Sequence, residues 1–166
     1  MPTVHISVGS NIDREKSIRS AISELRLRFG YLTLSNVYDT EAVGFDGDDF
    51  YNLIVAFESS ESPKNINHAL NEIEEKCGRT PEQKKFNSRT LDLDLTLYGD
   101  YISVDPKLQI PRKEITQYAF VLEPLAEIAG DLKHPVSKLS YKALWQAFDK
   151  SGLVQKTVIF KTLGND

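Results

Sequence analysis

Two acidic side chains in a short leucine-rich segment carry the chemistry that this sequence most clearly offers. Asp92 and Asp94 alternate with leucines, and this alternation of polar and apolar residues predicts a β-strand over residues 89–98. Side chains at positions i and i+2 of a strand lie on the same face, roughly 6.5 to 7 Å apart, so the two carboxylates project together. The residues that we expect on the opposite, core-facing side are Leu91, Leu93, Leu95 and Leu97.

Such a pair of carboxylates suits a hard divalent cation. Mg²⁺ takes one or two carboxylates and completes its octahedron with water and substrate phosphates, and two ions about 3.5 to 4 Å apart can be held together. The alternative is that the acidic pair is only the solvated face of an amphipathic strand.

Nearby cations favour the metal hypothesis. Arg79 and Arg89 flank a loop that also contains Lys84 and Lys85, and guanidinium groups can neutralise a bound polyphosphate. An acidic pair beside two arginines is what phosphoryl transfer requires, because that reaction depends mainly on positioning and electrostatics.

The sequence contains neither a P-loop pattern nor the kinase glycine-rich and catalytic-loop motifs, which argues against both of those enzyme classes. The three histidines lack metal-ligand spacing, and Cys77 belongs to an apolar helical stripe.

The predicted order of elements is strand, helix, strand, strand, helix, strand. Periodicity and turn residues place these elements at about 4–8, 11–29, 31–40, 50–59, 62–77 and 89–98, with an acidic loop over 41–49. This order predicts an α+β fold, a ferredoxin-like βαββαβ sandwich with an antiparallel sheet and both helices on one face. C-terminal additions follow, with a short helix expected over 141–149 and a strand over 157–160.

Composition limits the possible classes of protein. With 166 residues, 40% hydrophobic and 27% charged, the chain 1–166 is expected to form one globular domain, neither disordered nor membrane-embedded. A formal net charge of −4 argues against a protein that mainly neutralises nucleic-acid phosphates. A single cysteine excludes an intrachain disulfide, and we see neither a targeting segment nor an apolar run long enough to span a bilayer. We therefore expect a cytoplasmic monomer with no nucleic-acid or membrane partner.

Several ordered motifs together carry a family resemblance. They are Gly9-Ser10-Asn11, Tyr51-Asn52, Glu74 with Gly78-Arg79, the segment 89–95 with Tyr98-Gly99, and Pro111 with the segment 120–125. In this combination the chain resembles the hydroxymethyl-dihydropterin pyrophosphokinases of folate biosynthesis. The similarity runs from about residue 4 to about residue 128, and residues 150–166 form a possible terminal extension.

The resemblance implies a ferredoxin-like enzyme in which ATP, with two Mg²⁺ ions, donates pyrophosphate to the hydroxymethyl group of 6-hydroxymethyl-7,8-dihydropterin and AMP is released. It implies that Asp92 and Asp94 bind the magnesium ions and that Arg79, Arg89 and Asp94 are catalytic. The implied pterin-binding residues are Thr40, Ala42, Val43, Gly44, Phe50, Asn52, Phe86 and Phe120. The implied ATP-binding residues are Asn71, Glu74, Arg79, Phe86, Arg89, Lys107 and Arg112. Without the resemblance, Phe50 and Asn52 would be interpreted as sheet packing and a turn amide.

The sequence departs from the family pattern mainly on the nucleotide side. Arg112 stands where the family typically has a histidine, and Tyr118 replaces an arginine. Phe86 replaces a common tryptophan, and Pro81 replaces a basic residue. Arginine stays protonated above pH 12, so Arg112 could bind phosphate but could not exchange a proton near neutrality.

Two alternatives therefore stay open. The first is a divergent paralogue that binds pterin or nucleotide with weak or no catalysis, or that acts on another substrate. The second is an RNA-recognition module, which shares this order of strands and helices. The second is disfavoured by the acidic composition and by the lack of the aromatic motif of such modules.

Overall fold

A computed structural model describes residues 1–42, 47–78 and 90–160. Within these residues six strands form one sheet in the order β5-β1-β4-β3-β6, with β2 also paired to β4, and the pairings are antiparallel. The strands are β1 (Thr3–Ser10), β2 (Thr33–Leu34), β3 (Val37–Thr40), β4 (Phe50–Glu58), β5 (Asp92–Tyr98) and β6 (Lys156–Val158). The helices are α1 (Arg14–Phe29), α2 (Pro63–Lys76), α4 (Glu114–Gln117), α5 (Ala119–Ala129) and α6 (Tyr141–Ala147).

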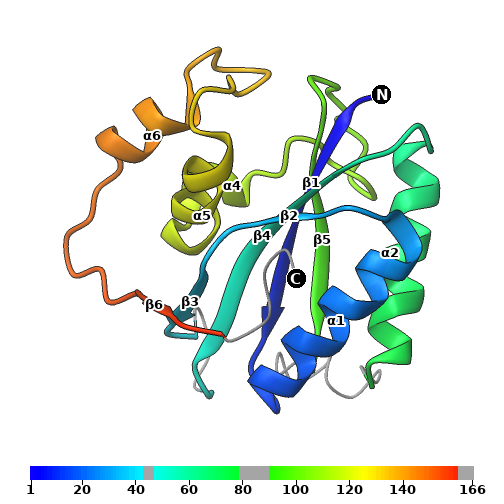
Figure 1. Cartoon of the computed structure of the whole chain (residues 1–166). Helices are drawn as coiled ribbons and strands as arrows, with labels where there is room; N and C mark the ends of the chain where they lie inside the picture. The colour runs from blue at the N-terminus through cyan, green and yellow to red at the C-terminus, as the bar shows by residue number, and fades with distance from the viewer. Residues whose placement is uncertain (43–46, 79–89, 161–166) are drawn as a thin grey trace.

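The central part of the chain has the predicted ferredoxin-like order. Strands β1, β3, β4 and β5 with helices α1 and α2 make the βαββαβ unit, and both helices cover the same face of the sheet (Figure 1). Helices α4 and α5 lie on the opposite face and α6 packs against α5, so the sheet lies between two helical layers (Figure 1). The α+β prediction is confirmed, whereas the second layer was predicted only as one short helix near 141–149. Helix α5 was missed because it contains Pro124, and proline is disfavoured in the interior of a helix.

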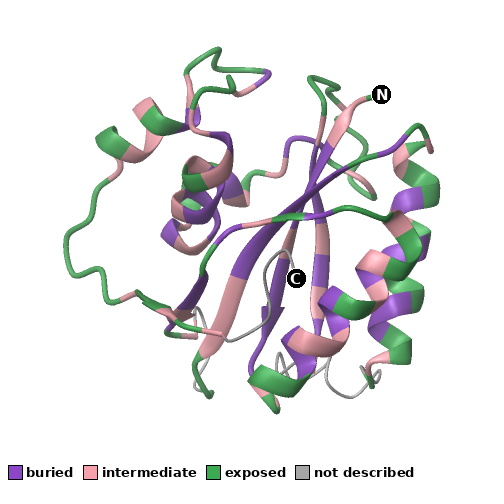
Figure 2. Cartoon of the chain, in the orientation of Figure 1, coloured by how far each residue is buried: buried purple, intermediate pink, exposed green. Residues whose placement is uncertain are grey.

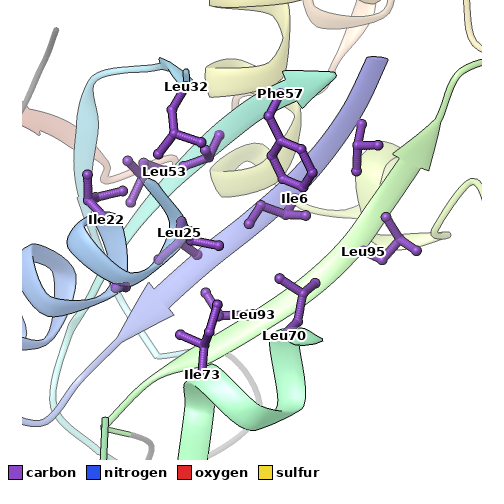
Figure 3. Packing of buried hydrophobic residues seen from close by; sticks show 14 of the residues in the cluster. Ile6, Ile22, Leu25, Leu32, Leu53, Phe57, Leu70, Ile73, Leu93 and Leu95 are labelled. Carbon is purple, nitrogen blue, oxygen red and sulfur yellow. The ribbon is translucent and has the colours of Figure 1, made fainter. Parts of the chain in front are cut away.

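The main hydrophobic core lies between the sheet and helices α1 and α2. Alternate residues of β1 and β5 face this layer, and Ile22 and Leu25 of α1 with Leu70 and Ile73 of α2 pack against them (Figure 3). Full burial of one such side chain contributes roughly 1.5–3 kcal/mol, so this layer dominates the stability of the sheet. Strands β1, β3, β4 and β5 are largely buried, whereas β2, β6 and the outward surfaces of α1 and α2 are more exposed (Figure 2).

Helix α2 begins as the sequence predicts. The Ser62 hydroxyl accepts a hydrogen bond from the backbone N–H of Asn65 at 3.2 Å, and Pro63 occupies the first helical position. Helix α1 begins later than predicted, after Asp13 in the left-handed region (φ 46°), and ends at Gly30 (φ 83°).

Strand β5 changes its orientation at a β-bulge. Ile6 of β1 pairs with Leu95 and His5 pairs with Leu97, so Thr96 is the extra residue. Beyond the bulge Leu97 turns to the other face and joins the second core cluster, with Ile54 and the helices α4 to α6. The prediction that all four leucines share one buried face is therefore wrong for Leu97.

The C-terminal segment returns to the sheet. Strand β6 pairs with β3, with Tyr38 opposite Thr157, close to the strand that was predicted at 157–160. The Gln155 side-chain amide donates to the carbonyl of Ala119 at 3.2 Å and to the Glu123 carboxylate at 2.7 Å, which fastens the segment to the start of α5. Among the helices of the described residues, none is long and apolar enough to cross a membrane.

Candidate active site

A cavity of about 320 Å³ opens on the face of the sheet that α1 and α2 leave uncovered. Ser7 and Gly9 of β1 line it, and they alternate with core residues that face α1 and α2, which fixes the side of the sheet. The other lining residues are Thr40, Glu41, Phe50, Asn52, Asp92, Asp94, Thr96, Arg112, Glu114, Tyr118, Phe120 and Val121. Segments far apart in the sequence thus meet over β1, β4 and β5.

The two strand carboxylates project into this cavity together. Asp92 and Asp94 both line it, while Leu93 between them is buried in the main core. Burial, and then repulsion from Asp92, raises the pKa of Asp94 to about 7, and the nearby Arg112 guanidinium opposes that rise. A third of the Asp94 side-chain surface stays accessible from the cavity.

This donor set fits magnesium. The described residues contain no group of three or more His, Cys, Asp or Glu side chains arranged to hold a metal, so the aspartate pair would act with water and substrate oxygens. Mg²⁺ prefers this arrangement because it keeps several waters and shares substrate phosphates, whereas structural zinc needs a closed protein cage. Repulsion between the two carboxylates is also what a cation would relieve.

Arg112 lies beside the aspartate pair and is held from three directions. Its backbone N–H donates to the carbonyl of Thr96 at 3.1 Å, and its Nε donates to Oε2 of Glu114 at 3.0 Å. Its Nη1 lies 3.8 Å from Oδ1 of Asp94, which is an ion-pair distance longer than a hydrogen bond. The bulge therefore fixes the backbone of Arg112, and Glu114 orients its guanidinium.

A polar pair and an aromatic pair also line the cavity. The Asn52 side-chain amide donates to the Thr40 hydroxyl at 2.7 Å. A Cβ at Gly9 would lie 2.8 Å from Oδ1 of Asn52, so only glycine lets the strand approach this amide. Tyr118 stacks on Phe120, with ring centroids 5.1 Å apart and planes at 18°. A flat ring with donors and acceptors along one edge would find both kinds of contact here.

The structure brings together many of the site residues that the sequence suggested. Thr40, Phe50, Asn52, Phe120 and Arg112 line the cavity with the aspartate pair. Ala42 is half-buried next to the lining residue Glu41 but does not line the cavity itself. The expected site residues that lie outside the described residues are Val43, Gly44, Arg79, Phe86 and Arg89.

Three residues expected at ATP lie away from the cavity lining. Glu74 is buried on α2, and its Oε2 accepts a hydrogen bond from the backbone N–H of Leu93 at 2.7 Å, so it anchors the start of β5. Asn71 is exposed on α2, and Lys107 is exposed in the segment after β5. Their ATP-binding role stays a prediction.

Sequence reasoning missed several residues that the structure adds to the cavity. The hydroxyl-bearing Ser7 could have been found, because it alternates with core residues on the same strand as Gly9. Glu114 gave no sequence signal, because its role depends on contact with Arg112. Tyr118 had been interpreted only as a lost arginine, whereas its ring forms part of the aromatic wall.

Comparison with known proteins assigns the family. The family model described as 7,8-dihydro-6-hydroxymethylpterin-pyrophosphokinase (HPPK) matches residues 5–130. The chain belongs to the HPPK family. An HPPK relative from Porphyromonas gingivalis, named 2-amino-4-hydroxy-6-hydroxymethyldihydropteridine pyrophosphokinase, is 37% identical over 141 residues, which cover 81% of this chain and 95% of the relative. The protein of the same name from Haemophilus influenzae is 33% identical over 154 residues, covering 90% and 95%.

Solved HPPK-DHPS structures share the fold. The one described as HPPK-DHPS in complex with substrates superposes with a TM-score of 0.68 at 12% identity, covering 90% of this chain and 44% of that one. Plasmodium falciparum HPPK-DHPS A437G with SDX-DHP gives a TM-score of 0.67 at 13% identity, covering 87% and 42%. The chain thus spans less than half the length of these structural relatives, and at this identity they support the HPPK fold alone.

Proposed function

We propose that this protein transfers pyrophosphate from ATP to the hydroxymethyl group of 6-hydroxymethyl-7,8-dihydropterin, giving AMP and the pterin diphosphate. The observation that carries this proposal is the meeting of two kinds of group in one cavity. The Asp92 and Asp94 carboxylates come from β5, the Asn52 amide comes from β4 on the far side of β1, and the ring of Phe120 lines the same cavity. A cavity so divided suits one polyphosphate substrate and one flat heterocycle.

The pterin would occupy the aromatic side. Its ring would stack near Phe120, and its amide-like edge would meet the hydrogen-bonding groups of Asn52 and Thr40. The Asn52–Thr40 hydrogen bond fixes the orientation of the amide before substrate arrives, so little ordering is needed on binding. In this arrangement the hydroxymethyl group would point toward the aspartate pair.

The triphosphate would occupy the acidic side together with Mg²⁺. Asp92 and Asp94 would hold two ions there, and when bound these ions supply positive charge that stabilises the transferring phosphoryl oxygens. Arg112 would donate hydrogen bonds to phosphate, and we propose the same role for Arg79 and Arg89.

In the reaction the hydroxymethyl oxygen attacks the β-phosphorus and releases its proton to solvent, the bond from that phosphorus to the α,β-bridging oxygen breaks, and AMP leaves with that oxygen. The chain contributes by binding and orienting both substrates in line.

A binding protein with weak catalysis is the second candidate. It is favoured by one observation: Tyr118, which stands where the family typically has an arginine, stacks on Phe120 and presents no cation to the cavity. Such a protein would bind pterin while handling ATP poorly.

The deciding experiment measures AMP formation from ATP, Mg²⁺ and 6-hydroxymethyl-7,8-dihydropterin. We expect Asp92→Asn and Asp94→Asn each to lower kcat by roughly 10²–10³-fold, because each removes charge that the transition state needs. Asp100→Asn is the matched control, because Asp100 is exposed in the turn that follows β5. Calorimetry separates the candidates: pterin binding without AMP formation supports the binding protein, and a folded protein with neither would refute both.

A further inference from the structure

Arg112 is the only cationic side chain that lines the cavity within the described part of the chain. Four acidic side chains line the same cavity: Asp92, Asp94, Glu114 and Glu41. Among the described residues, the guanidinium of Arg112 thus lies between carboxylates at the place where a metal and a polyphosphate are both expected. Two of its neighbours, Asp94 and Glu114, compete for it.

The contacts of this guanidinium are unequal. Its Nε is hydrogen-bonded to Glu114 at 3.0 Å, whereas its Nη1 stays 3.8 Å from Asp94. Its backbone is fixed by the Thr96 carbonyl, but 36% of its side-chain surface is accessible. The guanidinium is therefore attracted to Asp94 without a hydrogen bond to it. Its solvent-accessible part can turn toward a ligand.

We propose that Arg112 is the resident counter-ion of the Asp92–Asp94 pair, that a divalent cation must displace its charge, and that the nucleotide phosphates then take up the guanidinium. Glu114 is the positioning residue that keeps the guanidinium beside the pair. This inference rests on the proposed function, because it assumes that metal binds the pair and nucleotide binds beside it.

Because the charge of arginine is permanent, Arg112 repels any divalent cation that binds the aspartate pair. A guanidinium stays protonated throughout the physiological range, so it cannot relieve its repulsion of a divalent cation by losing a proton, as an imidazole could. It weakens metal binding when the nucleotide is absent, and it strengthens the complex when phosphate oxygens are there to accept its N–H groups. Metal and nucleotide consequently favour each other's binding.

The test measures Mn²⁺ binding by electron paramagnetic resonance, with and without a non-hydrolysable ATP analogue. Without nucleotide, Arg112→Gln should bind Mn²⁺ roughly tenfold or more tightly than the wild type at low ionic strength, and less so at high salt. With Mn²⁺ present, the same variant should bind the analogue roughly tenfold or more weakly, because charge-assisted hydrogen bonds are lost. This opposite response of one variant distinguishes a counter-ion from a residue that only binds nucleotide.

The neighbouring Lys113 supplies the matched control. It is exposed, and Lys113→Gln changes net charge by the same amount as Arg112→Gln. We expect its Mn²⁺ affinity to stay within about twofold of the wild type, because exposed charges are screened. Equal effects of the two variants, or no gain in Mn²⁺ affinity for Arg112→Gln, would overturn the proposal.

The positioning role of Glu114 is tested with and without the Arg112 guanidinium. Glu114→Gln should lower Mn²⁺ affinity without nucleotide by several-fold, since the released guanidinium moves closer to Asp94. In an Arg112→Gln background the same change should have a clearly smaller effect, and an undiminished effect would refute the positioning role. Asp92→Asn and Asp94→Asn should lose Mn²⁺ binding, which tests the metal site independently of Arg112. If Mn²⁺ binding is unchanged in these two variants, the proposed function is refuted, and this inference is refuted with it.

Discussion

His5 lies near the start of β1, and its contribution should lower the stability of the fold in acid. Its ring is buried on the face of the sheet that carries the active-site cavity, and its Nδ1 has no hydrogen-bond partner among the described residues. Burial lowers the pKa of His5 from 6.5 to about 4. The folded state thus keeps this ring neutral at a pH where the unfolded chain has already bound a proton.

The sign and size of the effect follow from proton linkage. Between pH 6.5 and 4 the unfolded state binds more protons, so the His5 contribution destabilises the fold as pH falls and is absent above pH 6.5. Integrating between the two pKa values gives losses of about 1 kcal/mol at pH 6, about 2 kcal/mol at pH 5 and about 3 kcal/mol at pH 4. Asp94 contributes with the opposite sign over this whole range, because its pKa is raised from 3.8 to about 7 in the folded state.

The perturbation that isolates His5 is His5→Leu, compared with the wild type by urea denaturation at a series of pH values. The Asp94 contribution is shared by both proteins and cancels in the difference. We expect the two stabilities to agree within about 1 kcal/mol at pH 8, because an unsatisfied nitrogen is lost and a similar volume is retained.

As pH falls the variant should become more stable than the wild type by the amounts above. His68→Leu is the control, because 77% of the His68 side chain is exposed on α2. A difference curve for His5→Leu that stays flat from pH 8 to pH 4 would refute the reasoning.

Three further substitutions test other contacts of the site. Gly9→Ala should raise the pterin KM by roughly 5–30-fold, because its Cβ would press on Oδ1 of Asn52 at 2.8 Å, and an unchanged KM would contradict the close approach. Gln155→Ala removes the hydrogen bond to Glu123 and should lower Tm by about 2–6 °C in thermal denaturation; no shift would show that the C-terminal segment contributes little. Glu74→Leu leaves a buried strand amide without its acceptor and should cost about 1–3 kcal/mol by urea denaturation, whereas Glu74→Gln, which keeps an acceptor oxygen, should cost less than half as much; equal costs would refute this role.

Local patterns predicted the parts of the fold that local interactions decide. The alternation of Leu93 and Leu95 with the aspartates predicted β5 and the shared face of the acidic pair, and Ser62 predicted the start of α2. These succeeded because strand alternation and helix capping involve residues close in sequence. The same logic failed at Leu97, because the bulge depends on the pairing of β5 with β1.

The sequence predicted those parts of the candidate site whose residues lie close together in one segment of the chain. The aspartate pair stands in one strand and was found, whereas Glu114 acquires its role from a contact with Arg112 and gave no signal. Tyr118 is similar, because its contribution comes from stacking on Phe120 within the folded chain. Side chains that act through a neighbour are not visible in residue type or spacing.

The extra residue in β5 links the length of this strand to the placement of the counter-ion. Without Thr96, Leu97 would follow Leu95 directly and would stay opposite His5, on the face of the second core cluster, so the packing of the leucines would survive. The N–H of Arg112 would lose its acceptor at the same time. A deletion of one codon here would therefore spare the core and disturb the placement of the counter-ion, so it would separate the folding of this strand from the function of the cavity that the strand lines.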